Sequence, residues 1–90
     1  MTESVEVQIK RLRMRSMRRG IKEMDLILQA FAEAHLEQMN ARELALYDRL
    51  LSENDHDIYA WIGGQVSVPA HYIELIGQIT KQAHGVTRPS

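Results

Sequence analysis

The sequence predicts an all-α protein, a compact five-helix bundle that forms a single domain over residues 1–90. The first observation is that apolar residues recur at helical spacing in five successive segments. The second is that glycine, proline, asparagine and aspartate residues separate these segments at short intervals. One alternating segment, residues 65–68, is too short and too isolated to pair as a strand, so no sheet is expected.

The first two helices are expected on either side of Gly20. Val5, Ile9 and Leu12 are spaced along one narrow face, which predicts a first helix. We interpret Gly20 as the C-cap of that helix, because glycine adopts a positive φ without strain. A second helix is predicted from about Ile21 to Leu36.

Capping residues mark the third and fourth helices. Asn40 is followed three residues later by Glu43, which predicts a variant of the capping box at the start of the third helix. Asp55 is expected to be the N-cap of a short fourth helix. That helix should end at the glycine pair 63–64.

The fifth helix is expected to follow Pro69, which suits its first helical position. Its predicted apolar stripe consists of Ile73, Ile76 and Ile79, with Leu75 beside it. Gly85 and Pro89 then mark a frayed tail over about residues 83–90.

Composition limits the classes of function. The chain has no cysteine, which excludes disulfides, thiolate catalysis and cysteine-based metal sites. No apolar run approaches the roughly 18–20 residues that span a bilayer. The N-terminus is acidic and polar, unlike a signal peptide, so a cytoplasmic location is expected.

The charges are segregated although the net charge is only -1. Residues 10–22 contain seven of the eleven basic residues and no acid, whereas residues 23–57 contain nine of the twelve acids. The basic segment could bind nucleic-acid phosphates or an acidic protein surface. It could equally be a solvated helix face, since arginine side chains readily cover apolar neighbours.

Enzymatic patterns are weak. The four histidines lack the spacing of a zinc site, and no glycine-rich phosphate loop is present. His56 lies between Asp55 and Asp57, but a helix cap with solvated neighbours explains this cluster. The sequence therefore predicts no catalytic residue, no metal and no cofactor of its own.

Two blocks of the sequence resemble one known family. The segment from Arg18 to Asp25 is similar to the R-G-x-x-E signature of the succinate dehydrogenase assembly factor 2 family, whose bacterial members are called SdhE. Downstream, Leu50-Leu51, Asp55-His56-Asp57 and Trp61 are similar to the family pattern L-L…D-x-D…W. The order and spacing of the blocks also fit, and the resemblance covers about residues 10–80.

The resemblance implies a five-helix bundle that acts as a chaperone and not as an enzyme. Members bind the flavoprotein subunit of succinate dehydrogenase, and in some bacteria that of fumarate reductase. They promote covalent attachment of FAD to a histidine of that subunit, so FAD belongs to the partner. We expect a monomer that neither inserts into membranes nor binds nucleic acid. The alternative from the basic segment is a small nucleic-acid-binding or antitoxin-like module.

The resemblance also implies a partner-binding surface at Arg19, Gly20 and Glu23, with Arg15 and Arg18 beside them. Gly20 would let a partner approach the bare backbone. Arg19 would offer its donor fork to the partner, and Glu23 would orient that arginine through an i,i+4 pair.

The second block is assigned mainly to the fold. Asp55, Asp57 and Trp61 are expected to stabilise the bundle, with a share in the interface as the alternative. Trp61 shares a helical face with apolar neighbours, which favours a place in the core. His56 stands where relatives commonly have proline, and this departure is expected to loosen the start of the fourth helix slightly.

Overall fold

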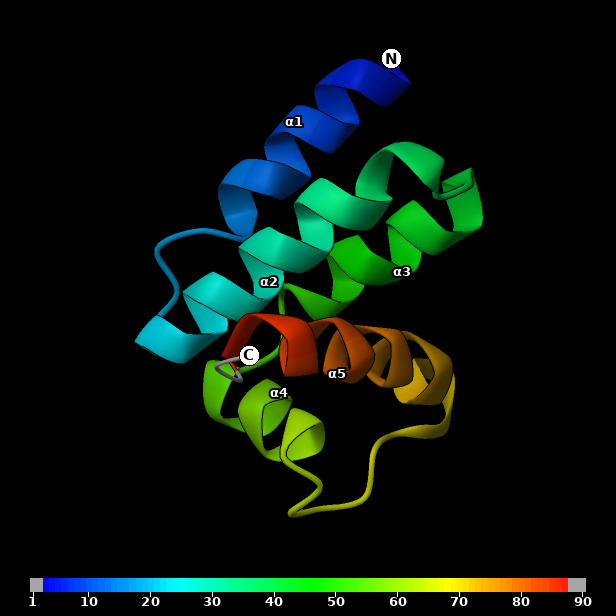
Figure 1. Ribbon diagram of the computed structural model, residues 1–90. Coiled ribbons are helices and arrows are strands. Elements are labelled where there is room, and N and C mark those ends of the chain that lie inside the picture. Colours follow the sequence, from blue (N-terminus) through cyan, green and yellow to red (C-terminus); the bar gives the residue numbers. More distant parts are fainter. Residues whose placement is uncertain (1–2, 88–90) are drawn as a thin grey trace.

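The computed structural model describes the backbone of residues 3–87 and the side chains of residues 3–83. Within this range the chain is helical and has no strand (Figure 1), so the all-α five-helix prediction is confirmed. In chain order the elements are α1 (Val5–Arg15), α2 (Lys22–His35), the 3-10 helix η1 (Leu36–Gln38), α3 (Ala41–Leu50), α4 (Asp55–Ile62), the 3-10 helix η2 (Ala70–Tyr72) and α5 (Ile73–Thr87).

Helix α2 is the centre of the bundle. It packs against α1 on one side and against α5 on another, and α5 also packs against α4. Figure 1 shows α5 running across the bundle, with α4 on its far side from α2 and α3. The described chain measures 39 × 29 × 23 Å along its principal axes. None of its helices is both long and apolar enough to cross a membrane.

The core combines one face from every α-helix. Its largest fully buried side chains are Phe31, Tyr47 and Tyr72, and the rings of Phe31 and Tyr47 lie 5.4 Å apart. Trp61 lies at the margin of this core. It is partly exposed, and its ring lies 5.7 Å from that of Tyr72.

The predicted C-cap at Gly20 is wrong. Helix α1 ends at Arg15 and is capped by Ser16, and the positive φ in the following loop belongs to Arg18, at 55°. The Ser16 side chain is wholly buried. The hydroxyl donates to the Leu12 carbonyl at 2.8 Å and lies 2.6 Å from the Tyr47 hydroxyl.

The capping box of α3 is confirmed, but the start of α4 differs from the prediction by one residue. Both hydrogen bonds of the box join Asn40 and Glu43, each at 2.9 Å. In α4 the N-cap is Asn54, and Asp55 is the first helical residue. The His56 N–H donates to the Asn54 side chain at 2.8 Å, a bond that proline could not form. This hydrogen bond offsets part of the loosening expected from the missing proline.

The start of α5 also differs from the prediction. Pro69 precedes a 3-10 turn, and α5 itself begins only at Ile73. The Ile73 side chain is 59% exposed and does not belong to the buried stripe, whereas the preceding Tyr72 is buried in the core. Helix α5 continues to Thr87, within the stretch predicted to fray, and residues 88–90 of that stretch lie outside the described residues.

Candidate functional site

The two sequence blocks meet at one carboxylate. Asp55, at the start of α4, accepts a hydrogen bond from the Gly20 N–H at 2.7 Å through Oδ2. Its other oxygen, Oδ1, accepts from Arg19 Nε at 2.8 Å and pairs with Nη2 at 2.7 Å. The loop between α1 and α2 is therefore fixed to α4 through adjacent residues of the signature.

The guanidinium of Arg19 is turned inward, contrary to its expected role as an outward donor fork. Nη2 donates to the Leu51 carbonyl at 3.0 Å, and Nη1 donates to the Arg15 carbonyl at 3.1 Å. Only 13% of the side chain is exposed. The backbone N–H of Arg19 is also held, by the Asp25 carboxylate. Every guanidinium nitrogen of Arg19 therefore has a hydrogen-bond partner in the bundle, and the side chain stabilises the loop from its buried side.

Glu23 does not form the predicted pair with Arg19. Its carboxylate accepts a hydrogen bond from the Tyr59 hydroxyl of α4, and this bond raises the pKa of Tyr59. Tyr59 was not selected from the sequence. Its position four residues after Asp55 places both on one face of α4, so the spacing contained a signal that helical geometry could have revealed.

Gly20 lies at the surface and is exposed. A Cβ atom at this position would lie 3.2 Å from Asp55 Oδ2, closer than ordinary van der Waals contact. Because Gly20 has no side chain, its backbone stays accessible to solvent. The same absence lets the backbone lie close to the Asp55 carboxylate. Arg18 is exposed beside it, whereas Arg15 is partly buried.

The basic segment is largely neutralised by the folded chain. Four of its arginines face carboxylates: Arg11 pairs with Glu3 and Asp48, Arg13 with Glu37, Arg15 with Asp48, and Arg19 with Asp55. Within residues 3–83, the basic residues of the segment without an ion pair are Lys10, Arg18 and Lys22. Two of these flank the Gly20 loop, so the remaining positive charge is concentrated near the signature.

Asp57, which belongs to the same sequence block as Asp55, lies in a different environment. Asp57 is exposed in the first turn of α4, where negative charge favours the helix. It has no ion pair among the described residues and does not contact the signature through any hydrogen bond there. Asp55 and Asp57 are therefore not equivalent, although the motif joins them.

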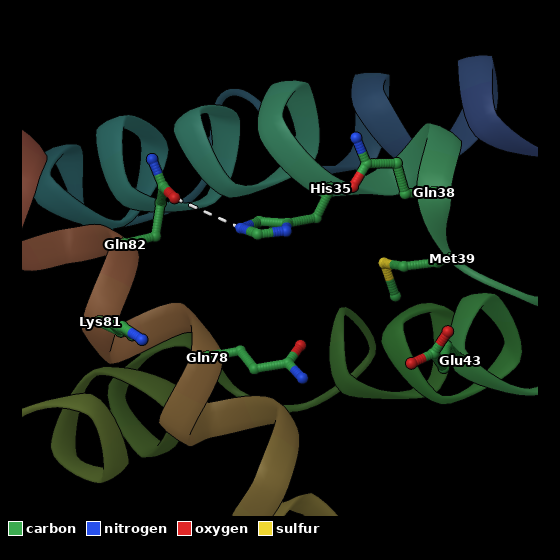
Figure 2. A pocket seen from close by; sticks show the side chains of 7 residues that line it. All are labelled: His35, Gln38, Met39, Glu43, Gln78, Lys81 and Gln82. Atoms are coloured by element: carbon green, nitrogen blue, oxygen red, sulfur yellow. Dashed lines mark hydrogen bonds between the residues drawn. The ribbon is translucent and has the colours of Figure 1, made fainter.

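A separate recess of about 570 Å³ lies between η1, α3 and α5 (Figure 2). Polar side chains line it, and His35 Nε2 lies 3.3 Å from Gln82 Oε1 across one end. None of the residues selected from the two motifs lines this recess. The described residues also contain no group of three or more potential metal ligands.

Comparison with known proteins identifies the family. A family model described as flavinator of succinate dehydrogenase matches residues 10–83. Succinate dehydrogenase assembly factor 2-A, mitochondrial, of Drosophila yakuba is 38% identical over 92 residues, which cover 96% of this chain and 57% of that protein. Succinate dehydrogenase assembly factor 2, mitochondrial, of Lodderomyces elongisporus is 49% identical over 59 residues, which cover 66% of this chain and 36% of that protein.

These relatives bear on the location and the extent of the chain. They are named as mitochondrial proteins, which contradicts the expected cytoplasmic location. The matched region is 57% or less of the length of these two relatives. The family match includes both sequence blocks and every residue of the candidate site. The resemblance is therefore confirmed, and the chain belongs to the succinate dehydrogenase assembly factor 2 family, the flavinators of succinate dehydrogenase.

Proposed function

We propose that this chain binds the flavoprotein subunit of succinate dehydrogenase and promotes its covalent flavinylation with FAD. The flavoprotein of fumarate reductase is a second candidate client, on the basis of the motif resemblance. The observation that carries the proposal is the Gly20 backbone, which is exposed but held in place by Asp55 within the region that matches the family. A partner could press closely against such a spot because no side chain intervenes.

The mode of action that fits these residues is positioning. The Arg19 guanidinium and the Asp55 carboxylate bind each other, and Asp55 also accepts from the Gly20 N–H, so these groups hold the loop in place. A rigid docking surface could hold the client's FAD-binding region in the geometry in which its own histidine bonds to the flavin. The chain then needs no catalytic residue, and the cofactor stays with the partner.

The nucleic-acid alternative has less support. Four arginines of the basic segment are paired with carboxylates, which reduces their attraction for a phosphate backbone. Of the three cations of this segment that have no ion pair within residues 3–83, Arg18 and Lys22 flank Gly20, and Lys10 lies on α1. Binding to duplex DNA that weakens steeply with added salt would favour this alternative over the proposed one.

The direct test is reconstitution from purified components. The unflavinylated flavoprotein subunit is incubated with FAD, with or without this chain, and covalent flavin is measured by in-gel fluorescence after denaturation. We expect the chain to increase the rate of covalent attachment, whereas an equimolar unrelated helical protein should not. Equal rates with and without the chain would refute the proposal.

A further inference from the structure

A second contact joins α2 and α4 one helical turn beyond the Gly20–Asp55 bond. It is the hydrogen bond from the Tyr59 hydroxyl to the Glu23 carboxylate. Glu23 is exposed, and no basic residue within the described side chains forms an ion pair with it. A carboxylate can accept about four hydrogen bonds. Tyr59 therefore fixes the direction of Glu23 while leaving most of its acceptor capacity open.

A cleft of about 260 Å³ lies directly beside this contact, between α2, α4 and α5. Ile27 and Ile62 provide apolar walls, and Thr80 and Gln65 contribute polar ones. Among the described residues that line it, Glu23 is the only Asp, Glu, Lys, Arg or His residue. The cleft thus combines apolar and polar walls with one carboxylate whose direction is set by Tyr59.

We propose that this cleft accepts a lysine or arginine side chain of the flavoprotein client. The inference rests on the proposed function, because it identifies what the client contributes next to the signature. The methylene stem would lie along Ile27 and Ile62, as long basic side chains do on apolar surfaces. The cation would meet the Glu23 carboxylate, and a charge-assisted bond of this kind is short and directional. Tyr59 is then a positioning residue, because it acts through Glu23.

Filling the cleft with the chain's own cation tests the inference. Thr80→Arg adds a guanidinium to the lining of the cleft that also contains Glu23, and we expect it to weaken binding of the purified flavoprotein about tenfold or more. Gln78→Arg is the matched control, because it adds the same side chain to an exposed position of α5 that does not line the cleft. Affinities are measured by titration calorimetry with the 90-residue chain, and helicity is checked by circular dichroism.

Two further variants probe the charge and its orientation. Glu23→Gln should weaken binding and also reduce its dependence on salt, because one ion pair is lost. Tyr59→Phe should weaken binding less, with the salt dependence retained, since the charge remains but is no longer oriented. A variant that lost affinity only through misfolding would not change the salt dependence selectively.

The outcomes separate this inference from the proposed function. If the unmodified chain binds the flavoprotein while Thr80→Arg and Gln78→Arg bind it equally well, the cleft inference is overturned and the proposed function stands. An equal loss in both variants would attribute the effect to net charge and would also overturn it. If the unmodified chain does not bind, the proposed function fails and the inference fails with it.

Discussion

Asp55 is the residue on which the geometry of the signature loop depends. Its carboxylate receives the Arg19 guanidinium and the Gly20 N–H together, and its side chain is 19% exposed. Hydrogen bonds to an ionised group are roughly twice as strong as neutral ones. Removing the carboxylate would leave the charge of Arg19 largely shielded from water and without an anion.

We therefore predict that Asp55→Ala lowers the free energy of unfolding by about 2–3 kcal/mol. Asp57→Ala is the matched control, because Asp57 occupies the same helical turn but is exposed and unpaired within the described residues. It should cost only about 0.5 kcal/mol, the scale of one charge near a helix N-terminus. Urea denaturation of both variants measures the difference. Equal losses would show that the contacts to Arg19 and Gly20 contribute nothing.

Gly20 offers a second prediction at this scale. Gly20→Arg should preserve the helical content but prevent docking of the flavoprotein, because the new side chain covers the exposed backbone and crowds Asp55. Ala45→Arg adds the same side chain on an exposed position of α3 and should dock normally. Pull-down of the flavoprotein by each variant, together with circular dichroism, checks both expectations. Docking by Gly20→Arg at the unmodified level would contradict a role for this surface.

At the scale of elements, local signals predicted the helices well and their junctions poorly. The capping box of α3 was predicted because both partners lie within four residues of sequence. The end of α1 was not predicted, because the Ser16 hydroxyl at this end contacts the hydroxyl of Tyr47, which is 31 residues away. The inward direction of Arg19 likewise depends on Asp55, 36 residues further along the chain. Such contacts are created by the fold and leave no local pattern.

Helix α1 is attached to the bundle by a mixture of apolar and ionic contacts. Ile9 and Leu12 are buried, while Arg11 and Arg15 both pair with Asp48 of α3. An isolated exposed ion pair contributes little, but a carboxylate shared by two arginines forms a small network. Loss of Asp48 should therefore weaken the packing of α1 against the bundle more than it weakens the packing of the other helices.

The corresponding prediction is that Asp48→Ala accelerates hydrogen exchange in α1. We expect roughly a fivefold increase for α1 amides, equivalent to about 1 kcal/mol, with little change in α2 and α5. Glu33→Ala serves as the control, because Glu33 is an exposed acid of α2 without an ion pair in the described region. Equal acceleration in all helices would show that α1 does not open independently.

At the scale of the whole molecule, folding pairs charges that are separated along the sequence. The sequence separates a basic segment from an acidic one, and the basic segment was a candidate for binding nucleic-acid phosphates or an acidic protein surface. The bundle instead brings Arg11, Arg15 and Arg19 against acids of the later segment. Long-range pairing of this kind cannot be deduced from charge counts, because it depends on which helices become neighbours. Among the described residues of the basic segment, Lys10, Arg18 and Lys22 keep no ion pair, and the last two flank Gly20.

The buried tyrosines predict how the stability of the whole bundle depends on pH. Burial raises the pKa of Tyr47 to about 12, and burial together with a hydrogen bond to Glu53 raises the pKa of Tyr72 to about 12. An unfolded tyrosine titrates near pH 10. Between about pH 10 and 12 the unfolded chain therefore loses protons that the folded chain retains, so rising pH favours unfolding.

The free energy of unfolding should accordingly be insensitive to these tyrosines below about pH 10 and should fall as the pH rises toward 12. Each pKa unit corresponds to about 1.36 kcal/mol per group, so the loss from the two tyrosines together should be several kcal/mol. Tyr47→Phe removes one of the two groups, which should make the decline shallower even though the variant also loses the hydrogen bond to Ser16. Urea denaturation from pH 8 to 11 measures both slopes. An unchanged slope in Tyr47→Phe would mean that Tyr47 titrates alike in the folded and unfolded chains, contrary to its complete burial in the core.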